Sequence, residues 1–276
     1  MPRSASRRSA GPTVSAIVLA ASLAVVGSLA GCGTTADEES RNWTPERLYS
    51  EAKEEQSAGN YDKAVKLYDR LEGRAAGTVL AQQAQLERAF VQWKNGDKAQ
   101  AVAGLERFVR LHPTSPAIDY AWYLQGLINF NDNLGLFGSL LSQDLAERDQ
   151  QAARDAYQAF RTLVEQHPQS TYADDARLRM AYIVNSLAAY EVHVARYYYR
   201  RGAYVAAANR AQQTLQEFQQ SPATEEALYI LAQSYDRLGL VQLRDDAERV
   251  LKQNYPNSAV ARAGLGGGQR SWWRLW

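Results

Sequence analysis

The sequence is poor in the residues that most catalytic and metal sites need. One cysteine and three histidines in 276 residues exclude an intrachain disulfide, a cysteine-based zinc site and an iron–sulfur cluster. There is no Gly-x-Ser-x-Gly or His-Glu-x-x-His motif, and the glycine-rich run at residues 264–268 lacks the Lys-Ser/Thr of a phosphate loop. A net charge of +1 gives no basic surface for nucleic acid. We therefore predict no enzymatic activity, no metal or cofactor, and no nucleic-acid partner.

Turn-forming residues are also scarce. Eight prolines and 18 glycines are few for an all-β chain of this length. Apolar residues make up 46% and charged residues 22% of the chain, which is ordinary globular composition with ample material for a core. The composition therefore favours one elongated helical domain or two small ones.

The first 31 residues have the pattern of a secretory signal peptide. Three arginines precede an apolar, Ala/Ser-rich stretch from Val14 to Leu29, and no acidic residue occurs in residues 1–36. The stretch is short for a membrane span, and it ends in Leu-Ala-Gly-Cys, which resembles the lipobox of bacterial lipoproteins. We therefore predict cleavage before Cys32 and lipidation of Cys32 by N-palmitoyl and S-diacylglycerol groups. The alternative for a lone cysteine is a small buried apolar residue.

A short polar segment follows the predicted anchor. Residues 32–42 show no apolar periodicity and are interpreted as a lipid-anchored tether. Gly33 follows the cysteine, whereas an Asp there commonly retains Gram-negative lipoproteins at the inner membrane. By that resemblance we expect a lipid-anchored protein on the periplasmic face of the outer membrane.

The body of the chain contains five similar segments. Their turn residues are separated by 37, 53, 53 and 37 positions and are Gly59, Gly96, Asp149, Gly202 and Gly239. A basic period of about 34–37 residues with two expansions is typical of tetratricopeptide arrays. The prediction is an all-α, tetratricopeptide-type α-solenoid of about five helix pairs over residues 43–263. An ordinary helical bundle is the alternative, against which the two His-Pro endings and the regular glycine turns argue.

The residue pattern within each segment fits paired helices. A glycine suited to a C-cap ends the first helix, and the second helix is expected to stop before a proline. Small residues recur where two helices must approach closely, in the pairs Ala52/Ala64, Ala89/Ala101 and Ala195/Ala207. Larger residues at i, i+3 spacing are expected on the inner face: Tyr68, Leu71, Leu105, Phe108, Phe160 and Leu163.

The two expansions predict an inserted loop in the third pair and a long first helix in the fourth. The loop, Asn131 to Arg148, carries apolar residues that either cover a partner site or fold back onto the repeat. The long helix is expected from about Tyr172 to Arg200. Its second half mixes tyrosines and arginines, including Tyr197 and Arg200, a composition typical of interface hot spots. The alternative is a core stripe with a solvated basic edge.

Taken over residues 43 to about 258, the chain resembles the BamD family, the tetratricopeptide lipoproteins of the outer-membrane β-barrel assembly machine. The most specific stretch is Val-Ala-Arg-Tyr-Tyr-Tyr-Arg-Arg-Gly-Ala-Tyr-Val-Ala-Ala-Ala-Asn-Arg at residues 194–210. Phe108–Pro116 followed by Ile118–Gly126, and the two segments at residues 148–154 and 167–173, support it. The turn at Leu71–Gly77 departs from the aromatic-Pro-aromatic-Gly turn usual in the family, and Arg200 stands where an acidic residue is common.

The resemblance implies a non-enzymatic subunit that binds the periplasmic POTRA domains of the BamA barrel protein and aids delivery and insertion of β-barrel proteins. It implies that the C-terminal units, residues 131–258, carry the POTRA contact. The N-terminal units, residues 43–130, would face unfolded outer-membrane protein substrates, with a pocket between Tyr49 and Tyr123, and lipoproteins of the BamC and BamE type. Arg201 matches the family's partner-binding arginine, and the other partner-binding candidates are Tyr197, Arg200, Tyr204 and Asn209.

Two alternatives remain at this stage. A tetratricopeptide envelope lipoprotein could instead serve a peptidoglycan or division complex. A helical-solenoid lytic transglycosylase would need a catalytic domain, for which no residues are left. The Gly/Trp-rich tail at residues 264–276, with three tryptophans beside Arg270 and Arg274, is interpreted as a membrane-interface or partner-docking segment, or as a tail folded over the last repeat.

Overall fold

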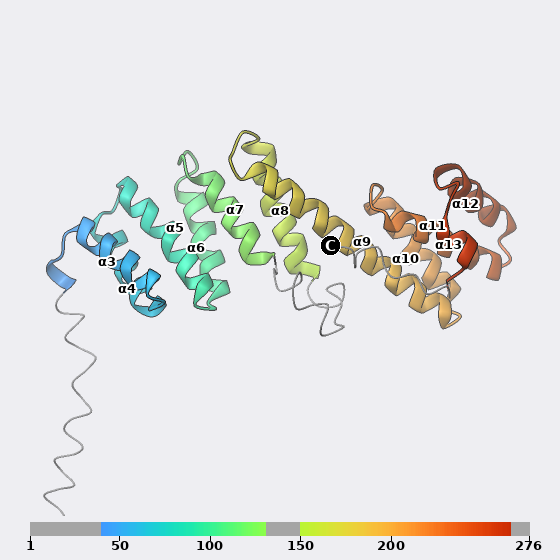
Figure 1. The fold of residues 1–276 in the computed structure, drawn as a ribbon, viewed down its shortest axis with the longest axis horizontal. Coiled ribbons are helices and arrows are strands. Elements are labelled where there is room, and N and C mark those ends of the chain that lie inside the picture. The colour runs from blue at the N-terminus through green and yellow to red at the C-terminus, as the bar shows by residue number, and fades with distance from the viewer. Residues whose placement is uncertain (1–39, 131–149, 266–276) are drawn as a thin grey trace, which may run out of the picture. The chain divides into compact units, whose positions relative to one another are not determined.

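The computed structural model describes residues 40–130 and 150–265, and this part of the chain is all-helical (Figure 1). It divides into two compact units at Ala84/Gln85. The signal peptide, Cys32, most of the tether, the inserted loop, Asp149 and the tail beyond Leu265 lie outside the described residues. The expected all-α fold of tetratricopeptide-type helix pairs is confirmed.

The first unit contains the start of the array. After a 3-10 turn η1 (Ser40–Asn42), the helices α3 (Pro45–Ser57) and α4 (Tyr61–Arg74) pack as a pair, and α5 (Val79–Lys94) runs on through the boundary between the units. Arg70 donates to the Ser40 hydroxyl, and Arg74 donates to the carbonyls of Arg41 and Trp43. The predicted tether thus already ends at Ser40, because these guanidinium groups fix residues 40–43 to α4.

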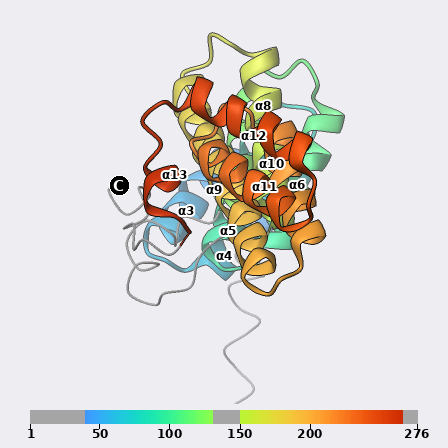
Figure 2. The same ribbon diagram turned by 90° about the vertical axis from the view of Figure 1, so that its right-hand side faces the viewer.

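The second unit holds the remaining helices, which are α6 (Lys98–Leu111), α7 (Ile118–Asn129), α8 (Gln150–Gln166), α9 (Ala173–Arg200), α10 (Tyr204–Glu217), α11 (Ala223–Arg237), α12 (Val241–Asn254) and α13 (Ala259–Ala263). Successive helices from α6 to α12 pack on one another, and α9 also packs on α11 (Figure 2). α9 has 28 residues, which confirms the long first helix of the fourth pair.

The predicted small and large positions are buried as expected. The three alanine pairs have no exposed surface, and the six larger residues from Tyr68 to Leu163 are at most 1% exposed. Alanine at these sites lets helix backbones approach closely, while the larger side chains fill the space between layers. The packing therefore has the two residue sizes that the repeat pattern predicted.

Four of the predicted turn glycines end a helix in the same way. Gly59, Gly96, Gly202 and Gly239 have φ between 71° and 92°, a conformation that costs glycine little because it has no Cβ. Each forms a Schellman motif, in which the next N–H bonds to the carbonyl five residues back, as from Ala203 to Tyr198 at 3.0 Å. These four turns give the α3–α4, α5–α6, α9–α10 and α11–α12 pairs the same hairpin.

The last helix pair, α11 and α12, has a charged residue at a position where other pairs have a buried alanine. Five positions after the turn glycine stand Ala64, Ala101 and Ala207, each fully buried, whereas Arg244 stands there in α12. Arg244 pairs with Asp236 at 3.0 Å and with Asp245 at 2.7 Å. A polar outer face on the terminal repeat suits its exposure to water, as solenoid arrays require.

Candidate partner-docking surface

The turn between α9 and α10 positions the main candidate residues. Arg201 is the C-cap of α9, and its N–H donates to the carbonyls of Tyr197 and Tyr198 at 3.1 Å each. Gly202 then turns the chain into α10 with φ 78°. Two arginines, Arg200 and Arg201, therefore sit at the negative end of a long helix dipole, where cations are favoured.

The three adjacent tyrosines of α9 divide between core and surface. Tyr198 and Tyr199 are half-buried against the core, while Tyr197 is 53% exposed. The Arg201 guanidinium carbon lies 5.5 Å from the centre of the Tyr197 ring, within the range of a cation–π contact. Arg200 is exposed, and neither it nor Arg201 has a carboxylate partner among the described residues. The turn thus presents an aromatic ring and two arginines without ion pairs.

Tyr204 and Asn209 have different positions from these three. The Tyr204 ring meets Tyr199 edge-on at 5.5 Å and is half-buried, so part of its role is packing. Asn209 is exposed on α10, one helical turn beyond the exposed Val205. Tyr197 and Arg201 are therefore in contact with each other. Tyr204 contacts Tyr199 instead, and Asn209 lies on a neighbouring face of α10.

Two ion pairs hold α9 in place beneath this turn. Arg196 donates to both carboxylate oxygens of Glu226 on α11 at 2.6 Å. Arg210 of α10 donates to Glu191 at 2.8 Å, and the Glu191 side chain is only 3% exposed. Bidentate and charge-assisted bonds fix orientation as well as distance. Sequence reasoning missed these two supports because each joins residues 19 to 30 positions apart.

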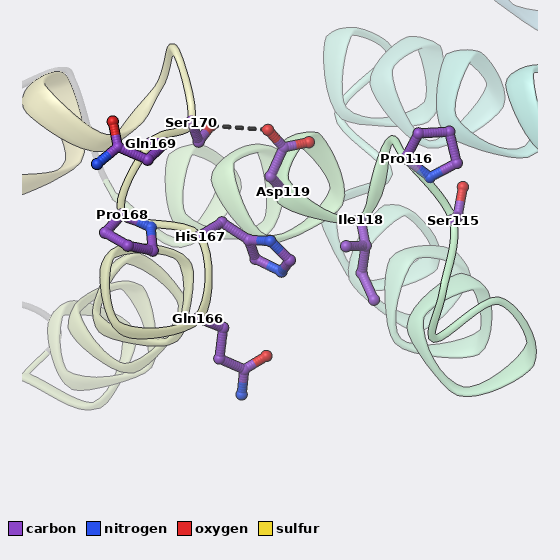
Figure 3. Close-up of a pocket in the computed structure, with 9 residues that line it drawn as sticks. All are labelled: Ser115, Pro116, Ile118, Asp119, Gln166, His167, Pro168, Gln169 and Ser170. Atoms are coloured by element: carbon purple, nitrogen blue, oxygen red, sulfur yellow. Dashed lines mark hydrogen bonds between the residues drawn. The ribbon is translucent and has the colours of Figure 1, made fainter.

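A second feature is a groove between the α6–α7 and α8–α9 turns, with a volume of about 520 Å³ (Figure 3). Ser170 donates to Asp119 at 2.7 Å across it. The Ser170 hydroxyl also accepts the Tyr172 N–H at 3.2 Å. Ser115 and Ser221 likewise accept the N–H of the second residue after them, and Ser258 accepts that of the third. The Ser170–Asp119 bond therefore ties one helix pair to the next.

Serine, aspartate and histidine meet in this groove without forming a catalytic relay. A nucleophilic serine is activated by a histidine that takes its proton, whereas the Ser170 hydroxyl donates to Asp119. The His167 ring points towards Ile118 in Figure 3. The backbone N–H of His167 donates to the Leu163 carbonyl at 2.8 Å and so ends α8. The groove is therefore interpreted as part of the repeat packing.

Metal sites and membrane-spanning helices are two further possibilities for residues 40–130 and 150–265. No group of three or more His, Cys, Asp or Glu side chains is placed there to hold a metal ion. Within the same residues, every helix is too short or too polar to cross a membrane. The predicted N-terminal pocket region, Tyr49 to Tyr123, extends over both units, and in the first unit Tyr49 accepts from Gln83 at 2.6 Å and meets Tyr68 edge-on.

Paired helices, repeated Schellman turns and an exposed aromatic–arginine turn define a tetratricopeptide-type binding scaffold. The family model described as "YfiO: Outer membrane lipoprotein" matches residues 41–261. Relatives named "Outer membrane protein assembly factor BamD" are 44% identical over 94% of this chain and 98% of theirs in Neisseria meningitidis, and 36% identical over 87% and 82% in Xylella fastidiosa. In Vibrio cholerae the identity is 31% over 84% and 96%. The chain belongs to this family of outer-membrane lipoproteins, the BamD family.

Proposed function

We propose that the protein is an outer-membrane protein assembly factor that acts as a scaffold without chemistry of its own. The observation that carries the proposal is the 44% identity, over nearly the whole of both chains, to relatives that bear this name. The helical repeats are consistent with it, because stacked helix pairs serve mainly as binding surfaces. The alternative role in a peptidoglycan or division complex is not favoured by these relatives.

The proposed partner of the α9–α10 turn is a POTRA domain of a BamA-type barrel protein. Arg201 and Arg200 would pair with carboxylates of that domain, and the exposed Tyr197 ring would supply apolar contact area next to them. Arginine and tyrosine are enriched among residues that dominate interface energies. Because the Arg196–Glu226 and Arg210–Glu191 pairs fix α9, this surface is ordered before the partner arrives, which lowers the entropic cost of docking.

The proposal extends to the two ends of the chain. Lipidation of Cys32 would attach the protein to the periplasmic face of the outer membrane, since two or more acyl chains anchor a protein stably. The N-terminal units at residues 43–130 would face unfolded β-barrel substrates and lipoproteins of the BamC and BamE type. The hydrogen bonds that Arg70 and Arg74 donate to residues 40–43 support this arrangement, because they mark where the folded body begins after the tether.

Affinity purification of the tagged lipoprotein from mildly solubilised outer membranes tests the proposal. We expect a POTRA-containing barrel protein to co-purify in stoichiometric amount, and Arg201→Glu to release it. The matched control is Arg110→Glu, which reverses another exposed charge at a helix C-terminus. Recovery of peptidoglycan or division proteins alone would contradict the assembly role, and a complex that survives Arg201→Glu would show that another residue anchors the partner.

A further inference from the structure

The turn between α11 and α12 exposes an unusual group of apolar side chains. Leu238 is 36% exposed, Leu240 43%, Val241 54% and Leu243 46%. Scattered exposed apolar residues are ordinary on a protein surface, but a contiguous group indicates an interaction site. Four such residues within six positions form a group of this kind.

The backbone of this turn does not need apolar residues. The α5–α6 turn has the same Schellman bonds, from Asp97 to Gln92 at 2.8 Å, and its sequence is polar: Asn95-Gly96-Asp97-Lys98. The equivalent residues around Gly239 are Leu238, Leu240 and Val241. Because a polar sequence forms the same turn elsewhere in this chain, the apolar residues here serve neither the turn nor the core.

This second turn is joined to the Arg201 turn. Leu238 takes the position in its repeat that Arg201 takes one repeat earlier, and Val241 takes that of Tyr204. α11 packs on both α9 and α10, and the nearby Tyr199 hydroxyl raises the pKa of Arg237, the residue before Leu238. Tyr199 in turn meets Tyr204. Residues 197–205 and 237–243 therefore form one continuous edge, called here the glycine-turn edge.

The two halves of the glycine-turn edge differ in chemistry. The first half carries Arg200, Arg201 and Tyr197, and the second half is apolar. Asp236, Asp245 and Asp246 lie beside the apolar half and pair with Arg244 and Arg249, so these ion pairs add no net positive charge that would favour an anionic lipid surface. A protein interface, in contrast, combines an apolar core with charged residues at its rim. The occupant that fits both halves is thus a protein domain.

We propose that residues 238–243 are the apolar half of the same docking surface whose charged half is Arg201. The partner domain would present an apolar patch next to its carboxylates, about one helix spacing of 8–10 Å away. This inference rests on the proposed function, because it assigns a second contact to the same partner. It adds Leu238, Leu240, Val241 and Leu243 to the residues that decide affinity.

The test gives the α11–α12 turn the polar residues of the α5–α6 turn. Leu240→Asp with Val241→Lys reproduces Asp97-Lys98, and Leu240 is the N-cap of α12 as Asp97 is of α6. The double variant of the full lipidated chain is therefore expected to fold with unchanged helicity. Its affinity for a detergent-solubilised barrel protein with its POTRA domains should fall at least tenfold. Val250→Lys, on α12 outside the edge and 37% exposed, should change affinity less than twofold.

The outcomes separate the two proposals. If the wild-type chain does not bind the barrel protein, the proposed function fails. If wild type binds and Arg201→Glu weakens it while the double variant binds like wild type, the apolar half is refuted and the proposed function stands. Vesicle co-flotation without the barrel protein, with Cys32→Ser added to remove the predicted lipid anchor, is the remaining readout. Loss of vesicle binding in the double variant, with partner affinity unchanged, would assign the patch to lipid and overturn the inference.

Discussion

The close approach of α7 and α8 at Gly126 predicts that a single added methyl group destabilises the second unit. Gly126 lies inside α7, facing the fully buried Phe160 of α8. A Cβ built on Gly126 would lie 2.4 Å from Cε1, 2.6 Å from Cδ1 and 2.7 Å from Cζ of the Phe160 ring. These distances are far below van der Waals contact at 3.5–4.0 Å. Gly126→Ala therefore requires the ring to move by about 1 Å within a packed core.

The expected effect is a net destabilisation of about 1 kcal/mol. Overpacking a core costs about 1–3 kcal/mol, while replacing a helical glycine by alanine returns about 0.5–1 kcal/mol. For a unit of this size the melting temperature should fall by about 2–4 °C. Differential scanning calorimetry of the mature chain measures this shift directly.

The chain contains a matched control for this substitution. Gly104 is also inside a helix, α6, but the nearest atoms to its added Cβ are Ala89 Cβ and Gln92 Oε1, both at 3.9 Å. Gly104→Ala should therefore raise the melting temperature by about 1–4 °C through helix propensity alone. In addition, Phe160→Leu should reduce the cost of Gly126→Ala when the two are combined. Equal or higher stability of Gly126→Ala would refute the close α7–α8 approach.

Three further predictions concern the polar ties between helix pairs. Ser170→Ala removes the hydroxyl that donates to Asp119 and accepts the Tyr172 N–H, so we expect the free energy of unfolding to fall by about 1–2 kcal/mol, measured by urea unfolding; an unchanged midpoint would contradict it. Burial raises the pKa of Asp175, but hydrogen bonds from Arg179 and Tyr123 outweigh it and hold that pKa below its usual value. A lowered folded pKa contributes stability above the unfolded pKa of about 4 that is lost as pH falls, so the melting-temperature gap between wild type and Asp175→Asn should narrow between pH 6 and pH 3, and a constant gap would refute this. Arg196→Met and Glu226→Leu should each destabilise by about 1–3 kcal/mol but be less than additive together, as a double-mutant cycle would show; strict additivity would exclude coupling through this pair.

The sequence predicted the repeat architecture because its signals are local. A glycine in the left-handed conformation can be read from one position, and the buried alanine pairs lie at fixed distances from it. The same locality predicted that the three adjacent tyrosines of this helix could not all face the core, and Tyr197 is the exposed one. Arg201, in contrast, was assigned from the family resemblance. Lipidation of Cys32 and the partner roles of Tyr197, Arg200, Arg201, Tyr204 and Asn209 stay predictions.

Features that depend on distant residues escaped prediction. Arg70 and Arg74 donate to residues some 30 positions earlier in the chain. Because no local pattern reveals these bonds, the tether was expected to extend to residue 42. Asp175 looks like a solvated first-turn residue in the sequence, yet it accepts from Tyr123 at 2.7 Å. The apolar turn at residues 238–243 carried a usable signal: aligning it with Asn95–Lys98 shows apolar residues where the same turn is polar.

Photo-crosslinking from position 197 identifies the protein that lies against the α9–α10 turn. A benzoylphenylalanine at position 197, placed in the full chain in cells, keeps an aromatic ring at the exposed end of α9. We expect a crosslink from this position to the POTRA-bearing barrel protein. The matched position is Tyr182, which is 43% exposed on the same helix but about four turns away. Crosslinking to the barrel protein from 182 and none from 197 would contradict the docking surface described here.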